Sequence, residues 1–329
     1  MIKKSFNFYG FKVNIEGPFA EFFYKEYTYF YKKKLYNPNI RFIYADNKKK
    51  LDIHDYDISL PSNVNLIKNY IYYSSNTNFS FLIMLFESIV NMRNKILIHG
   101  VAYNKHKTIF IAGPDDTGKT SLAIKLSDEG AEIFSEDWSC VDLNGNVFPW
   151  PRKCHLFDYN FVQSHDILNK RINYSINLKK IKTYFKDLVK LNSLFLQKVY
   201  NYLINQQYYA YSFENLGGKT AVQKKKIDRF FWFQKKNVKK IQFKNISKQD
   251  LINRITGHYL YERSEYFRIY SRLSSLGNES NIISKYLIKN NEYRKKLNIF
   301  FKNFKTVKEI SIPKKMNAKE VSDYIYKNI

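Results

Sequence analysis

The residues best suited to chemistry form one short run in the middle of the chain. It reads Gly113-Pro114-Asp115-Asp116-Thr117-Gly118-Lys119-Thr120, followed by Ser121, and it matches the Walker A pattern G-x-x-x-x-G-K-[ST] in full. Glycines in this pattern let backbone amides converge on phosphate oxygens at the positive end of a helix. We expect Lys119 to reach the β- and γ-phosphates and the Thr120 hydroxyl to bind Mg²⁺. The run predicts a nucleoside triphosphate site.

The sequence around this run predicts the elements that such a loop needs. Residues 107–112 read as a buried strand, and residues 119–128 read as a helix that Gly130 ends. A helix over 78–92 and a strand over 96–103 precede them. The alternative interpretation is an ordinary strand–turn–helix connection. In a phosphate-binding loop, Asp115 and Asp116 are expected to point their amides toward the phosphates and their side chains away, without a catalytic part.

Two adjacent carboxylates, Glu136 and Asp137, end the next predicted strand, 131–135. Phosphoryl transfer uses one carboxylate to hold Mg²⁺ and often a second to accept a proton from the attacking hydroxyl. Neighbouring residues at a strand end point to opposite sides, so this pair could divide the two tasks. The alternative is a solvated acidic turn. His99 lies on the strand before the loop, where a core histidine is the alternative to an active-site role.

The order of these features resembles the HPr kinase/phosphorylase superfamily, which shares a nucleotide-binding core with phosphoenolpyruvate carboxykinase. The features are His99-Gly100-Val101, a short hairpin, the glycine-rich loop, a helix ending Glu129-Gly130, and a strand ending in two acids. The segment Val147-Phe148-Pro149-Trp150-Pro151-Arg152 is similar to an aromatic–proline–arginine turn of that group. The resemblance is specific over residues 95–155 and compatible in arrangement from residue 225 onward.

The resemblance implies an α/β fold with a P-loop core of the HPr-kinase/phosphoenolpyruvate-carboxykinase type. It implies that Glu136 is the catalytic base, that Asp137 lies near the metal with Thr120, that His99 is an active-site residue, and that Arg152 contacts substrate or phosphate. The chain departs from the family at two points. Glu136 replaces the usual aspartate, and the Arg-Gly-apolar-Gly signature of true HPr kinases is missing, so HPr is not the expected substrate.

Composition indicates a globular protein. Apolar residues make up 44% of the 329 positions and aromatic residues 18%, which excludes a disordered chain. We expect a mixed α/β N-terminal layer over 1–75 and a kinase-like domain over 76–329, with a helical insertion around 160–215.

Charge and cysteine content bear on partners and location. The net charge is +26, but the basic residues are spread along the chain, and AT-rich codons can produce such an excess. This disfavours nucleic acid as the partner. Two cysteines and no targeting segment predict a cytoplasmic protein. The most apolar stretch, 79–90, is shorter than the roughly 20 residues of a bilayer span.

The sequence therefore predicts an ATP- and Mg²⁺-dependent kinase that phosphorylates a hydroxyl. The acceptor is a Ser or Thr of a peptide or protein, or a small hydroxylated metabolite. A non-catalytic nucleotide-binding regulatory module, with a basic face for nucleic acid, is the alternative. A P-loop hydrolase would need a water-orienting residue that the pattern does not identify. Homo-oligomer formation stays open.

Overall fold

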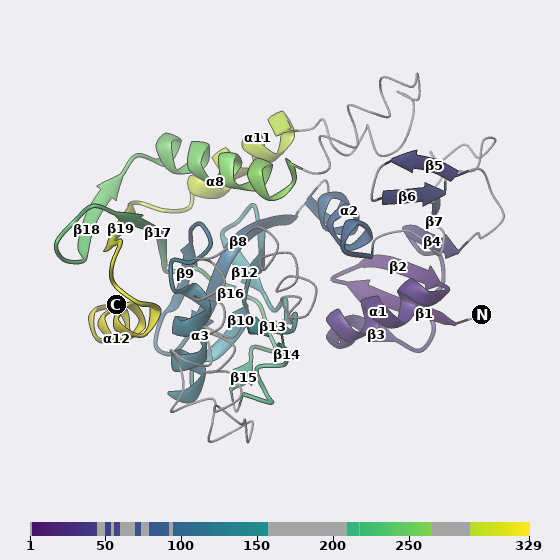
Figure 1. The fold of residues 1–329 in the computed structure, drawn as a ribbon, viewed down its shortest axis with the longest axis horizontal. Helices are drawn as coiled ribbons and strands as arrows, with labels where there is room; N and C mark the ends of the chain where they lie inside the picture. Colours follow the sequence, from purple (N-terminus) through teal and green to yellow (C-terminus); the bar gives the residue numbers. More distant parts are fainter. Residues whose placement is uncertain are drawn as a thin grey trace, which may run out of the picture. The chain divides into compact units, whose positions relative to one another are not determined.

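A computed structural model describes residues 2–44, 50–53, 56–59, 70–73, 79–91, 95–156, 209–216, 218–264 and 290–329 (Figure 1). These residues form a mixed α/β structure with six α-helices. Its contacts define two units. The first comprises Met1–Ile98, Cys140–Asn146 and Ser247–Lys305, and the second comprises His99–Ser139, Val147–Ile246 and Thr306–Ile329. The sequence predicts a single boundary after residue 75, whereas the two units alternate along the chain.

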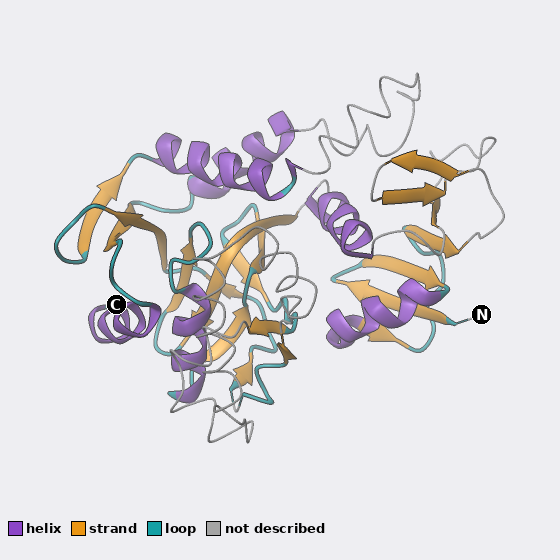
Figure 2. Cartoon of the chain, viewed as in Figure 1, coloured by secondary structure: helices purple, strands orange, loops and turns teal. Residues whose placement is uncertain are grey.

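The first unit begins with a sheet in the order β3-β1-β2-β4-β7. Strands are drawn orange in Figure 2. Its strands are β1 (Lys3–Phe8), β2 (Phe11–Glu16), β3 (Tyr31–Lys32), β4 (Ile40–Tyr44) and β7 (Tyr70–Tyr73). The unit also contains α1 (Pro18–Glu26), a 3-10 turn (Thr28–Phe30), α2 (Phe79–Asn91), and a hairpin of β5 (Lys50–Ile53) with β6 (Tyr56–Ser59). Aromatic rings fill its core: Phe8 lies 4.6 Å from Phe86 between ring centroids, and Phe6 lies 4.8 Å from Phe23.

A buried polar network lies in the same unit, where α8 (Lys248–Glu262) packs against α11 (Asn290–Phe301). The Glu87 carboxylate accepts hydrogen bonds from the Tyr27 hydroxyl at 3.0 Å and from Arg263 at 3.3 Å. The guanidinium of Arg263 lies 4.2 Å from the ring centroid of Tyr259, which stacks on Tyr293. Burial raises the pKa of Tyr293 well above its usual value. The two charged groups of this network, Glu87 and Arg263, are paired with each other, as burial requires.

The second unit contains most of a larger sheet in the order β16-β12-β11-β8-β9-β17-β19-β18, with β10 paired to β8 and β15. Its strands are β8 (Lys95–Asn104), β9 (Thr108–Ala112), β10 (Glu132–Ser135), β11 (Trp138–Asp142), β12 (Asn146–Phe148), β15 (Lys219–Thr220), β16 (Lys225–Lys226), β17 (Arg229–Lys236), β18 (Gln242–Ile246) and β19 (Val307–Pro313). A separate pair joins β13 (Cys154–Leu156) to β14 (Tyr209–Tyr211). At the centre, β9, β17 and β19 are parallel.

Two helices pack together in the second unit, α3 (Lys119–Asp128) and α12 (Ala318–Asn328). Their apolar residues share one core with Ile111, Phe233 and Ile310 from the parallel strands. Lys125 of α3 forms an ion pair with Asp323 of α12. The run Asn317-Ala318-Lys319-Glu320 predicts a capping box. The structure confirms it at the start of α12, where Asn317 and Glu320 accept hydrogen bonds from each other's backbone amides.

The pair Asn144-Gly145 predicts a hairpin over 139–150 with a type I′ turn. The hairpin forms, but its loop is not a type I′ turn: Gly145 has φ 78° and Asn144 does not have a positive φ. The Asp142 carboxylate instead accepts the amides of Asn144 and Asn146, which favours a three-residue loop. Most of the predicted 160–215 insertion lies outside the described residues. Of the helices that the structure does describe, none has both the length and the apolar character needed to cross a bilayer.

Candidate phosphate site

The loop over residues 113–118 joins β9 to α3, as the sequence predicts. A side chain at Gly113 would place its Cβ 2.6 Å from the carbonyl oxygen of Phe233 on β17, so only glycine fits this approach. Gly118 has φ 91°, a conformation that glycine adopts without strain. Between them, the hydroxyl of Thr117 donates to the carbonyl of Pro114 at 2.8 Å. The loop therefore has a defined shape that depends on both of its glycines.

Lys119 is buried beneath this loop. Its ammonium donates hydrogen bonds to the carbonyl oxygens of Gly113, at 2.8 Å, and Pro114, at 2.6 Å. The ammonium thus reaches back across the loop from the first turn of α3. Ser121, in the same turn, is buried, and within the described residues its hydroxyl has no hydrogen-bond partner. A buried cation and an unsatisfied hydroxyl beside a glycine loop are groups that an anionic ligand would satisfy.

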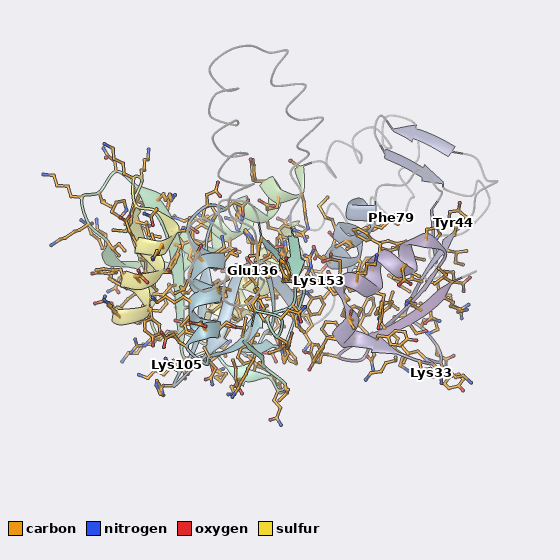
Figure 3. The ribbon with its side chains drawn as sticks, turned by 60° about the horizontal axis from the view of Figure 1, so that its bottom comes forward. Lys33, Tyr44, Phe79, Lys105, Glu136 and Lys153 are labelled. Atoms are coloured by element: carbon orange, nitrogen blue, oxygen red, sulfur yellow. The ribbon has the colours of Figure 1, made fainter. Side chains whose placement is uncertain are left out.

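The first of the two acids lies against the loop's threonine. The hydroxyl of Thr120 donates a hydrogen bond to the carboxylate of Glu136, which is only 6% exposed. Strand β10 pairs with β8, with Ser135 opposite Ala102, and this register carries the following residues toward the loop. Figure 3 labels Glu136 among the side chains of the second unit. A hydroxyl and a carboxylate in contact form the oxygen donor set that Mg²⁺ prefers.

The second acid faces other partners. One oxygen of Asp137 lies 3.0 Å from Nε2 of His99, and the other lies 3.5 Å from an Nη of Arg152. His99 adjoins Gly100, which is opposite Ala112 in the β8–β9 pairing, so the imidazole is level with the start of the loop. Asp137 has φ 73°, in the left-handed region that non-glycine residues rarely adopt. His99 and Arg152 thus hold this carboxylate from two sides.

The aspartates of the loop, Asp115 and Asp116, are both exposed. One carboxylate oxygen of Asp115 lies 3.5 Å from Nε2 of His99. The imidazole of His99 therefore lies between the carboxylates of two acids, Asp137 and Asp115. Asp116 is exposed and has φ 58°. Of the two loop aspartates, Asp115 is the one that lies near His99.

The structure brings the predicted site residues together in the second unit, and it changes one relationship between them. The two acids diverge, as expected from their adjacency. However, Glu136 is the acid that contacts Thr120, whereas Asp137 was expected on that side. The positive φ of Asp137 explains the difference, because strand alternation predicts side-chain direction only where the backbone stays extended.

Sequence reasoning missed Ser139, which bonds the acidic turn to Gly100. Ser139 donates a hydrogen bond to the carbonyl of Gly100 at 2.8 Å and also pairs with Ser135. No motif marks Ser139, since its partner Gly100 lies 39 residues away. The thiols of Cys140 and Cys154 are free and buried, as expected for small apolar residues. Burial raises the pKa of Cys154 well above its usual value, and the charges of Glu136 and Asp137 add to this effect.

Comparison with known proteins adds no assignment: the sequence matches no protein-family model and no curated protein. The interpretation of this site therefore depends on its own residues and their geometry.

Proposed function

We propose that this protein is a phosphotransferase that uses ATP and Mg²⁺ to phosphorylate a hydroxyl group. The observation that carries the proposal is the hydrogen bond from Thr120 to the buried carboxylate of Glu136, next to a complete glycine–lysine loop. A loop that only connected a strand to a helix would need neither a buried lysine nor a buried acid at this position. Together these groups provide a phosphate cradle and a pair of oxygen ligands for a cation.

The residues present fit both Mg²⁺ and a triphosphate. Thr120 and Glu136 supply hard oxygen ligands, and the buried hydroxyl of Ser121 lacks a partner within the described residues. Lys119 would exchange the carbonyls of Gly113 and Pro114 for phosphate oxygens. Bound Mg²⁺ would supply neutralisation of phosphate charge, which is a large part of catalysis in phosphoryl transfer.

The geometry supports a division of labour opposite to the one that the family resemblance implies. We assign Glu136, with Thr120, to the metal, and Asp137 to the acceptor hydroxyl. In this assignment the acceptor oxygen bonds to the γ-phosphorus, the bond from that phosphorus to the ADP oxygen breaks, and the acceptor's proton goes to Asp137. His99 and Arg152 hold the carboxylate of Asp137 in place for that transfer.

The resemblance to HPr-kinase-like enzymes belongs to this proposal. It is supported by the order of His99, the loop, and the acid pair along the second unit. In this assignment the tasks of Glu136 and Asp137 are exchanged relative to those that the resemblance implies. We therefore propose the acceptor only as a hydroxyl on a peptide, a protein or a small metabolite.

The decisive experiment incubates the purified protein with γ-labelled ATP, Mg²⁺ and a cell extract, and then identifies the labelled acceptor. A Lys119→Ala protein serves as the matched negative control. Label that appears on one acceptor with the wild type alone supports the proposal. Tight binding of ATP by the wild type, with no label transferred to any component, would instead indicate the non-catalytic nucleotide-binding module.

A further inference from the structure

The acidic turn that carries Glu136 and Asp137 makes two hydrogen bonds to Gly100 of β8. The amide of Gly100 donates to the carbonyl of Asp137 at 2.7 Å, and the carbonyl of Gly100 accepts from the Ser139 hydroxyl at 2.8 Å. Both hydrogen-bonding groups of one backbone residue are thus used by the same turn. Gly100 is the residue after His99. Its hydrogen bond to the Asp137 carbonyl therefore links the backbone next to His99 to the backbone of Asp137.

Gly100 fits this position because it lacks a side chain. A Cβ there would lie 2.9 Å from the Cα of Ala112 and would also clash with the carbonyl of Ile111. The residue is therefore wedged between the turn and β9, the strand that leads into the loop. A shift of the turn relative to Gly100 would move Asp137 relative to both His99 and the loop.

Asp137 needs contacts of this kind because its own backbone conformation is unfavourable. Its φ of 73° costs energy for any residue with a side chain and persists only where surrounding contacts enforce it. Held conformations of this kind cluster at functional sites. The two hydrogen bonds to Gly100 are among the contacts that hold this conformation here.

The two serines of the turn contribute differently. A hydroxyl has one proton, and that of Ser139 goes to the Gly100 carbonyl. Ser135 must therefore be the donor in the Ser135–Ser139 hydrogen bond. Both side chains are almost completely buried, at 1% and 0% exposed. Of the two serine hydroxyls, that of Ser139 bonds to β8 and that of Ser135 bonds to Ser139, so the pair provides its own matched control.

We propose that Ser139 is a positioning residue of the phosphoryl-transfer site, which fixes Asp137 against His99 by clamping the acidic turn to Gly100. This inference rests on the function proposed above for the same site. Ser139 touches neither substrate nor nucleotide in this role and acts through the placement of Asp137.

The test compares full-length Ser139→Ala with Ser135→Ala. Each removes one buried hydroxyl, so both should lose similar stability, but only Ser139→Ala breaks the clamp. We expect Ser139→Ala to lower kcat for release of labelled phosphate from Mg·ATP to water by about 10- to 100-fold, with KM within about twofold. Ser135→Ala should keep kcat within about twofold. Equal loss of kcat in both variants, or no loss in Ser139→Ala, would overturn the proposal.

A second readout does not depend on catalysis. The protein has six histidines, and a His99→Gln variant assigns the His99 signal in a ¹⁵N imidazole NMR spectrum. The His99 signal should move in Ser139→Ala and stay in Ser135→Ala. An unmoved signal in both refutes the clamp. A moved signal in a protein that fails to bind Mg·ATP refutes the proposed function and leaves the clamp standing. If Ser139→Ala does not fold, Ser139→Cys keeps the volume with a weaker donor and should move the same signal.

Discussion

The Thr120 hydroxyl donates a hydrogen bond to Glu136, 16 residues further along the chain, while the neighbouring Asp137 faces His99 instead. Two adjacent carboxylates thus occupy different surroundings, one at the loop's threonine and one between a histidine and an arginine. The separation gives each acid a task that can be tested without knowledge of the acceptor.

Metal binding should depend on Glu136. We expect Glu136→Gln to weaken Mn²⁺ binding to the protein–ATP complex about tenfold or more, because an amide is a poorer ligand than a carboxylate. Asp137→Asn should stay within about twofold of wild type. Electron paramagnetic resonance of Mn²⁺, with ATP present, measures both. A larger loss of Mn²⁺ affinity in Asp137→Asn than in Glu136→Gln would indicate that Asp137 is the metal ligand.

Phosphoryl transfer should depend on Asp137 in a different way. Asp137→Asn keeps the side-chain size but removes the proton acceptor, so we expect transfer to the labelled acceptor to fall about 10²- to 10⁴-fold. Binding of ATP, followed by calorimetry, should change little. Wild-type transfer rates in Asp137→Asn would exclude this carboxylate as the base.

Nucleotide binding should depend on Lys119. Lys119→Ala removes the ammonium that bonds to the carbonyls of Gly113 and Pro114. We expect this variant to show no measurable ATP binding. The loss of a buried donor should also cost about 1–3 kcal/mol of stability. Lys107→Ala, at an exposed turn of the same unit, is the control and should bind ATP normally. Unchanged ATP affinity of Lys119→Ala in calorimetry would exclude a phosphate-binding loop.

The buried network of the first unit should dominate the stability effects. Glu87→Ala leaves Arg263 buried without its carboxylate, and we expect it to lower the free energy of unfolding by about 3–5 kcal/mol. The half-exposed Glu132–Lys225 pair offers a comparison, since Glu132→Ala should cost no more than about 1 kcal/mol. Urea denaturation of both variants measures the difference. Similar losses would show that burial of the Glu87 pair contributes little.

The thiols should be protected in the folded protein. Burial raises the pKa of Cys140 to about 12, so this thiol stays protonated in the folded state at pH 8.5, where an unfolded cysteine is about half ionised. Its contribution to stability is complete below about pH 8.5 and is lost as the pH rises toward 12. Iodoacetamide labelling followed by mass spectrometry should therefore modify Cys140 and Cys154 in urea but not in native buffer. Rapid native labelling would contradict the burial.

Local patterns predicted much of the second unit. The glycine loop, the strand before it and the helix after it follow from Gly113, Gly118 and the apolar run between 107 and 112, since each depends on neighbours in sequence. The cap at Asn317 is equally local, because its partner Glu320 is three residues away. Such features need no knowledge of the rest of the chain.

The direction in which the Glu136 and Asp137 side chains point could not be predicted from local patterns. The direction of Asp137 depends on a left-handed backbone that contacts with Gly100 help to hold, and Gly100 lies on another strand. Asp115 reaches His99 only because the β8–β9 pairing places the histidine beside the loop. These relationships arise from strand pairing and packing, which one-dimensional periodicity does not describe.

The packing of α12 on α3 also has a consequence for how the protein is made. Gly118 at the start of α3 lies near Val321 and Ala318 of α12, and Lys125 pairs with Asp323, which is 198 residues later in the sequence. At about 5–20 residues per second, a ribosome needs roughly 10–40 s to synthesise that stretch. During this interval the apolar face of the newly made α3 has no partner from α12. A chaperone that binds exposed apolar helices would therefore meet this segment early, and the loop would gain its full support only when α12 emerges.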